Sequence, residues 1–164
     1  MAKLLRRNQF LRDRRGDTDL VEFSLILPIF LLLMFALIDL GRYYWIRETV
    51  ENAVRQAGRY AVTGQNSGST NRVASIEQVA QNAMAGLYNP DTTTITVSGS
   101  PVGRSGSTTT NFGGYGGENV TVTISTQLGF FTPGIARYFG PSGSNTLTET
   151  VTFRNESFPV GQAN

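Results

Sequence analysis

The 164-residue chain contains no cysteine and no histidine, and its single lysine is Lys3. These absences exclude disulfide bonds, thiolate nucleophiles, zinc sites built from cysteine and histidine, and imidazole general bases. Serine and threonine are abundant, but no histidine or nearby lysine is available to activate them. The acids that follow residue 63 stand singly in the sequence. We therefore predict that the chain is not an enzyme, with no catalytic residue, no metal site and no cofactor.

The charges are distributed unevenly, which the formal net charge of +2 conceals. Residues 1–16 carry six basic side chains and one acid, whereas residues 17–164 carry eight basic and eleven acidic side chains. The basic character of the chain therefore belongs to its amino end. Nothing in the remainder indicates a surface for nucleic acid, and we expect no nucleic-acid partner.

A long apolar run follows the basic segment. Residues 23–38 (FSLILPIFLLLMFALI) are uncharged and are flanked by Glu22 and Asp39. Extended to residues 20 and 40, the run would form about 31 Å of helix, close to the thickness of one hydrocarbon core. Basic residues beside a span stay cytoplasmic, so we predict one membrane-spanning helix with its amino end inside and the remainder outside. A cleaved secretory signal would be shorter, and a buried core helix would need more covering protein than this chain has.

The helical pattern continues beyond the apolar run. Small apolar residues recur there at spacings of three and four, on one face of a helix: Ile46, Val50, Ala53, Val54, Ala57 and Ala61. Charged residues occupy the other faces, and Glu51 precedes Arg55 at the spacing of a stabilising helical pair. Glycine and polar residues from Gly64 onward end the pattern. We predict one helix of roughly 40 residues, half in lipid and half outside it.

The rest of the chain predicts a second helix followed by strands. The second helix is expected over residues 73–87, with Asn71 or Thr70 as its cap. Threonine alternates with β-branched aliphatic residues at about 92–98, 118–127 and 145–155. This alternation is typical of an antiparallel sheet with one covered face. The predicted fold class is α+β, with one long helix, a second short helix and a small antiparallel sheet of about three to four strands.

Two segments do not fit this pattern. Residues 99–117 are rich in glycine and lack a phosphate-loop motif, so we predict a flexible, exposed loop. Residues 128–141 (LGFFTPGIARYFGP) contain four aromatic side chains, Phe130, Phe131, Tyr138 and Phe139. We expect this second segment to close the core or to contact another subunit; contact with membrane or a partner is the alternative.

Several motifs together resemble the TadE-like pilins of the tight-adherence (Flp-type) pilus. They are RRG at 14–16 followed by VEFSLILP at 21–28, then IDLGRYY at 38–44 and AGRYA at 57–61. The carboxyl-terminal tail at 148–156 is more weakly similar. The resemblance implies a pilin-like fold in the bacterial inner membrane. It implies a cytoplasmic leader at 1–16, the membrane-spanning half of the helix at 17–42 and an exported domain at 43–164.

The resemblance also implies a processing step. TadE-like proteins are made as prepilins, which a membrane aspartic peptidase cuts after a glycine; they then act as minor pilins or pseudopilins in pilus assembly. Gly16 is the only glycine before the span, so the implied cut lies between Gly16 and Asp17. The implied partners are other pilins or pseudopilins, the prepilin peptidase and inner-membrane lipid. In this family the glutamate usually stands fifth after the cut, whereas Glu22 stands sixth.

Glu22 is the residue to which the resemblance gives a role in subunit assembly. A carboxylate is costly inside a bilayer and favours a partner. The implied partner is the new α-ammonium group that cleavage leaves on Asp17 of a neighbouring subunit. The alternative is a carboxylate that rests at the headgroups beside Arg14 or Arg15.

Asp39 and Arg42 mark the exit of the helix from the membrane, and we predict an exposed pair three residues apart. The alternative function for the whole chain is an uncleaved, single-pass, membrane-anchored binding or adhesion protein. Its exported α+β domain would hold a ligand through the glycine-rich loop or the aromatic segment. The two functions differ in the fate of Gly16.

Overall fold

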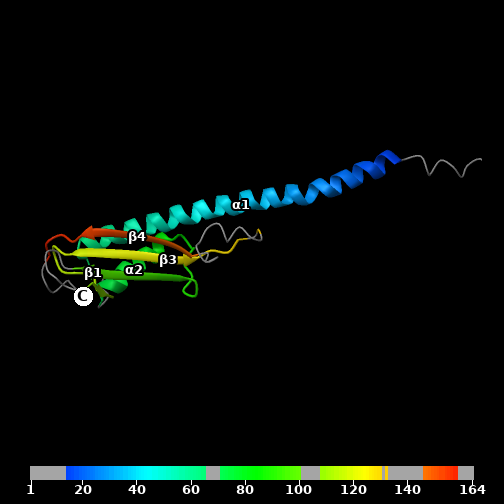
Figure 1. The fold of residues 1–164 in the computed structure, drawn as a ribbon. Coiled ribbons are helices and arrows are strands. Elements are labelled where there is room, and N and C mark those ends of the chain that lie inside the picture. Colours follow the sequence, from blue (N-terminus) through cyan, green and yellow to red (C-terminus); the bar gives the residue numbers. More distant parts are fainter. Residues whose placement is uncertain (1–13, 66–70, 101–107, 131, 133–145, 159–164) are drawn as a thin grey trace, which may run out of the picture.

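A computed structural model describes residues 14–65, 71–100, 108–130, 132 and 146–158 of the chain. This part contains the helices α1 (Arg14–Val62) and α2 (Arg72–Ala83) and the strands β1 (Thr93–Ser100), β2 (Thr109–Thr110), β3 (Asn119–Gln127) and β4 (Thr146–Arg154). The strands form one antiparallel sheet in the order β2-β1-β3-β4. Figure 1 shows α1 as a long rod whose amino-terminal half projects away from the sheet and α2. The predicted α+β fold class is confirmed.

The carboxyl-terminal half of α1 packs on the sheet through the predicted apolar stripe. Its six members are 0–6% exposed: Ile46, Val50, Ala53, Val54, Ala57 and Ala61. This half of α1 contacts β3 and β4, while α2 lies beside it and contacts β1. The two helices therefore cover the same face of the sheet and enclose one core with it.

The sheet separates apolar and hydroxyl side chains by face. In the strand register Val97, Val122 and Val151 lie in one row, and the first two are 0% exposed. The opposite face carries threonine and serine, whose hydroxyls pair across β3 and β4 at 2.8–3.0 Å: Thr121 with Thr152, Thr123 with Thr150, and Ser125 with Thr148. Alternation along each strand thus produces the half-covered sheet that the sequence predicted.

Helix α2 begins at the predicted cap and ends earlier than expected. The Asn71 side chain accepts a hydrogen bond from the backbone N–H of Val73 at 2.9 Å. The helix ends at Ala83 and does not reach Leu87. Ala85 has a φ of 50°, in the left-handed region, and such a residue cannot continue a right-handed helix.

The prediction of an exposed loop at 99–117 is only partly correct: residues 108–111 and Tyr115 are exposed, but the other described residues are not. The segment contributes to β1 and β2, and Gly113 and Gly114 are buried. Gly114 has a φ of +74°, and a Cβ there would lie 2.9 Å from Nδ2 of Asn155. The segment is therefore packed against the rest of the domain at this turn; residues 101–107 lie outside the described residues.

A buried arginine explains this packing. Arg72 is 0% exposed. Its guanidinium donates to the carbonyl oxygen of Gly114 at 2.7 Å, to Oδ1 of Asn155 at 3.4 Å and to the carbonyl oxygen of Ala61. The guanidinium carbon also lies 4.5 Å from the centre of the Phe158 ring. One cation thus joins the end of α1, the glycine-rich segment and the residues that follow β4.

The position of Arg72 is electrostatically favourable although it is buried. The carbonyl of Ala61 lies in the last turn of α1, where the helix dipole attracts a positive charge. Desolvation lowers the pKa of Arg72, but arginine stays protonated in proteins. Sequence reasoning missed this network because its acceptors stand 11, 42 and 83 residues from Arg72. An arginine beside a helix cap usually faces solvent.

The contact between α1 and β4 should depend on a single glycine. A Cβ added at Gly58 would lie 2.5 Å from Cε2 of Phe153 and 3.0 Å from Cγ1 of Val151, whereas one at Gly41 would meet nothing within 4 Å. We expect Gly58→Ala to lower the free energy of unfolding by about 1–3 kcal/mol through overpacking. The control Gly41→Ala should keep or raise it, by up to about 1 kcal/mol. Denaturant unfolding in detergent micelles measures both, and equal effects would contradict the close approach.

The buried cation should be far more important for stability than an exposed one at the same helix end. Arg72→Met leaves three acceptors without their donor, and we expect it to cost about 2–5 kcal/mol of unfolding free energy. Arg72→Lys should also be destabilising, because an ammonium lacks the planar fork of donors. Arg59→Met is the control, since Arg59 is exposed in the last turn of α1 and contributes at most about 1 kcal/mol. Similar losses for Arg72→Met and Arg59→Met would refute the network.

Candidate functional site

The amino-terminal half of α1 presents an apolar surface that no described part of the chain covers. No side chain between residues 18 and 38 is buried. Thirteen large apolar side chains there are 36–72% exposed: Leu20, Val21, Phe23, Leu25, Ile26, Ile29, Phe30, Leu32, Leu33, Met34, Phe35, Leu37 and Ile38. This is the one helix, among the described residues, that is long and apolar enough to cross a membrane. Exposed apolar surface of this extent marks an interaction site. We refer to residues 18–38 as the apolar half of α1.

The apolar half ends sharply at Asp39, the first buried side chain of α1 within its described side chains. Asp39 is 1% exposed, and its Oδ2 accepts a hydrogen bond of 2.7 Å from the backbone N–H of Thr132. The prediction that Asp39 is exposed is therefore wrong. The sequence could not show that a segment 93 residues further on folds back over this carboxylate.

Arg42 lies one turn beyond Asp39 and is exposed, as expected. Its Nη1 donates to the carbonyl oxygen of Gly129 at 3.1 Å. Asp39 and Arg42 thus both bind the backbone that follows β3, one through an N–H and one through a carbonyl. Their common role in the fold is to attach this segment to the helix at the end of the apolar half.

The first part of the aromatic segment closes the core at this end of the domain. Leu128 is 9% exposed and belongs to the core, and Phe130 packs against it. This agrees with the expected contribution to the core. Phe131, Tyr138 and Phe139 lie outside the described residues.

The other predicted site residues lie near the amino-terminal end of α1, far from Asp39 and Arg42. They are Gly16, Asp17 and Glu22. The backbone of Gly16 and Asp17 belongs to the first turn of α1, and Glu22 is exposed little more than one turn further on. No ion pair joins Glu22 to another described side chain. Glu22 and Asp39 stand 17 residues apart on one helix, which corresponds to about 25 Å along its axis. The five predicted residues therefore form two groups, one at each end of the apolar half.

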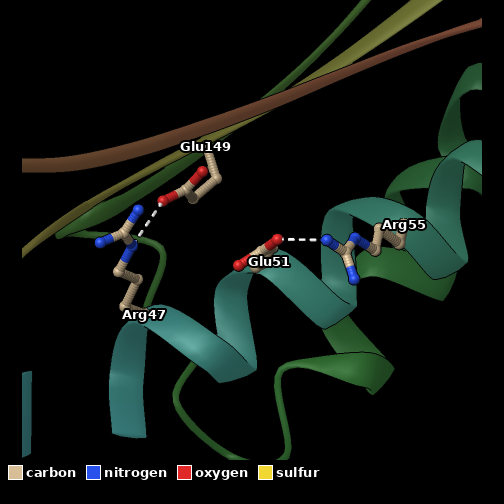
Figure 2. Close-up of polar contacts among 4 residues, drawn as sticks. All are labelled: Arg47, Glu51, Arg55 and Glu149. Carbon is tan, nitrogen blue, oxygen red and sulfur yellow. Dashed lines mark hydrogen bonds and ion pairs between the residues drawn. The ribbon is translucent and has the colours of Figure 1, made fainter. Parts of the chain in front are cut away.

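The carboxyl-terminal half of α1, which packs on the sheet, carries ion pairs along its flank. Nε of Arg47 lies 3.4 Å from Oε1 of Glu149 on the edge strand β4. Glu51 pairs with Arg55 one turn further along the helix, as the spacing predicted. Figure 2 shows the first pair bridging helix and strand and the second lying along the helix. Partly exposed pairs contribute about 1 kcal/mol or less, so apolar packing provides most of the attachment of α1.

The comparison with known proteins yields a match within α1 only. Residues 20–59 match the family model described as TadE-like protein. The match covers nearly all of the apolar half and most of the carboxyl-terminal half of α1, and it ends before α2 and the sheet. No curated protein and no solved structure matches the chain. The long helix thus contains a segment similar to TadE-like proteins, as the sequence predicted.

Proposed function

We propose that the chain is a structural subunit of the tight-adherence pilus, a minor pilin or pseudopilin. Its amino end would lie in the cytoplasm, the apolar half of α1 in the inner membrane, and the α+β domain outside. The observation that carries the proposal is the contrast between the two halves of α1. The carboxyl-terminal half is buried along a stripe by its own domain, whereas residues 18–38 contain no buried side chain. That surface is available first to lipid and then to the helices of other pilins.

The proposal includes removal of a leader. Cleavage after Gly16 would release residues 1–16, which carry six basic side chains and one acid. Losing this charge removes the groups that hold the amino end at the cytoplasmic face. Gly16 lies within α1, so the backbone there has to unwind to enter a peptidase. Glycine makes this easier, because it weakens a helix by about 0.5–1 kcal/mol relative to alanine.

After cleavage, Glu22 would pair with the α-ammonium group of Asp17 in a neighbouring subunit. Glu22 is exposed and lies at the amino-terminal edge of the apolar half. Carrying such a carboxylate to the bilayer centre costs about 2.5–3.5 kcal/mol, so a partner within the membrane would be strongly favoured. The pair would set the axial position of one helix against the next, while the apolar side chains supply the contact area.

Processing should depend on Gly16 and on no other glycine of the helix. Co-expression with the cognate prepilin peptidase should remove the first 16 residues, and Gly16→Leu should abolish this because the branched side chain obstructs the cleavage site. Gly41→Leu is the matched control, since Gly41 is an exposed glycine of the same helix, and it should be shortened normally. Intact-mass spectrometry of the membrane fraction measures the product. A chain that stays uncleaved would refute the pilin function and favour the anchored binding protein.

Assembly should depend on the Glu22 carboxylate. Glu22→Leu should leave membrane insertion unchanged or improved, because it removes a charge from the edge of the span. Co-purification with other pilins should fall roughly tenfold if the pair contributes about 1.4 kcal/mol. Asp19→Asn is the control, because Asp19 is exposed in the preceding turn. This substitution should leave co-purification with other pilins unchanged. Unchanged association of the Glu22→Leu protein would show that the carboxylate merely rests at the headgroups.

A further inference from the structure

The attachment of the segment after β3 determines how close the outer domain comes to the membrane. Gly129 lies beside Arg42, and Thr132 lies beside Asp39, so this segment runs along α1 toward the apolar half. Three residues of helix correspond to about 4.5 Å. In Figure 1 the chain after β3 extends beyond the sheet along α1, on the side of the projecting rod. The domain therefore reaches the last turn of the apolar half, with no free stretch of helix between them.

The level of these contacts can be compared with the dimensions of a bilayer. If a hydrocarbon core of about 30 Å is centred on residue 30, its outer edge falls near residue 40 of an upright helix. The polar layer beyond that edge is about 5–8 Å thick. Asp39 and Arg42 would then lie at the edge and within this layer. Tyr44 and Trp45 would lie about 6–8 Å above the edge, at its outer limit.

The side chains at this level have the character of an interfacial layer. Tyr44 and Trp45 are 54% and 56% exposed, although the next residue, Ile46, is buried in the domain core. The rings of Tyr43 and Tyr44 lie edge to face, with centroids 5.6 Å apart. Phe130 is half-buried and packs on the core from the attached segment. Tyrosine and tryptophan concentrate where a protein surface passes through the headgroups, because one end of each ring is apolar and the other polar.

We propose that three of these aromatic residues form a membrane-facing base, defined as Tyr44, Trp45 and Phe130, that rests in the headgroup layer of the bilayer crossed by α1. Lipid is the occupant because the exposed rings of Tyr44 and Trp45 continue the apolar half almost without interruption, through Leu40, which is 39% exposed. The outer domain is thus held against the membrane, and the Asp39 carboxylate is covered by the backbone of the domain, away from lipid. This inference rests on the proposed membrane insertion of α1.

The single tryptophan of the chain, Trp45, provides the test. Tryptophan fluorescence of the full chain is measured in lipid nanodiscs that hold one copy per disc. Three quenchers are compared: lipids brominated near the headgroup, lipids brominated at the chain end, and aqueous iodide. We expect stronger quenching of Trp45 by the shallow bromine than by the deep bromine. Iodide quenching should be several-fold weaker than at a distal control position. The control moves the tryptophan to the other end of the sheet, Trp45→Phe with Tyr115→Trp, where Tyr115 is 45% exposed.

Two further variants distinguish the base from insertion itself. Trp45→Phe with Leu32→Trp should be quenched by the deep bromine, which reports membrane insertion independently of the domain. Trp45→Phe with Phe130→Trp places the reporter on the attached segment and should respond to the shallow bromine. Adding Asp39→Ala to this last variant should make the reporter accessible to iodide, whereas adding Asp91→Ala, at an exposed acid, should not. Circular dichroism confirms that each variant remains folded.

The outcomes separate the possible explanations. If the Leu32→Trp reporter is insensitive to both bromines, the proposed insertion fails together with the base. If that reporter responds, but Trp45 is as accessible to iodide as the Tyr115→Trp control, the base is refuted while insertion stands. If Trp45 becomes shielded only when other pilus components are added, the surface belongs to a subunit contact and the lipid proposal is likewise overturned.

Discussion

The structure depends on one continuous helix that has to satisfy two different surroundings. Helix α1 has 49 residues, and the change between its halves occurs at Asp39, where burial by the domain begins. A carboxylate at that boundary would be costly if left in an apolar environment, and the N–H of Thr132 satisfies it. The exit from the apolar half is therefore also the place where the α+β domain is attached to it.

The attachment of the domain relies on close packing, since the chain has no cysteine for disulfides. Alanine and glycine on the inner face of α1 let the helix approach β4 closely, and Phe153 occupies the space that a side chain at Gly58 would fill. The interior of the domain is dense because its members are small and β-branched. On the uncovered face of the sheet, paired hydroxyls satisfy one another while remaining open to water.

The end of the domain farthest from the apolar half is organised differently, around a buried cation. Arg72 binds the last turn of α1, the turn at Gly114 and the amide of Asn155, so three distant parts of the chain depend on one side chain. The Asn155 amide also donates to the carbonyls of Gly113 and Tyr115, at 2.9 and 3.0 Å. The two ends of the domain are therefore closed by polar contacts to backbone, and the apolar core lies between them.

The sequence by itself determined the features that repeat along the chain. The uniform apolar run, the stripe from Ile46 to Ala61 and the alternation of threonine with aliphatic residues each follow a period that one strand or helix imposes locally. The motifs around the span also identified the TadE-like character of α1. Only the tertiary structure decided which polar residues are buried. Asp39 and Arg72 resemble ordinary surface charges in the sequence, and their partners are backbone groups of remote segments, which carry no signature in residue type. The burial of the glycine-rich turn was not predicted for the same reason. Glycine permits both flexibility and close packing, and only the position of the neighbouring chain shows which of the two applies.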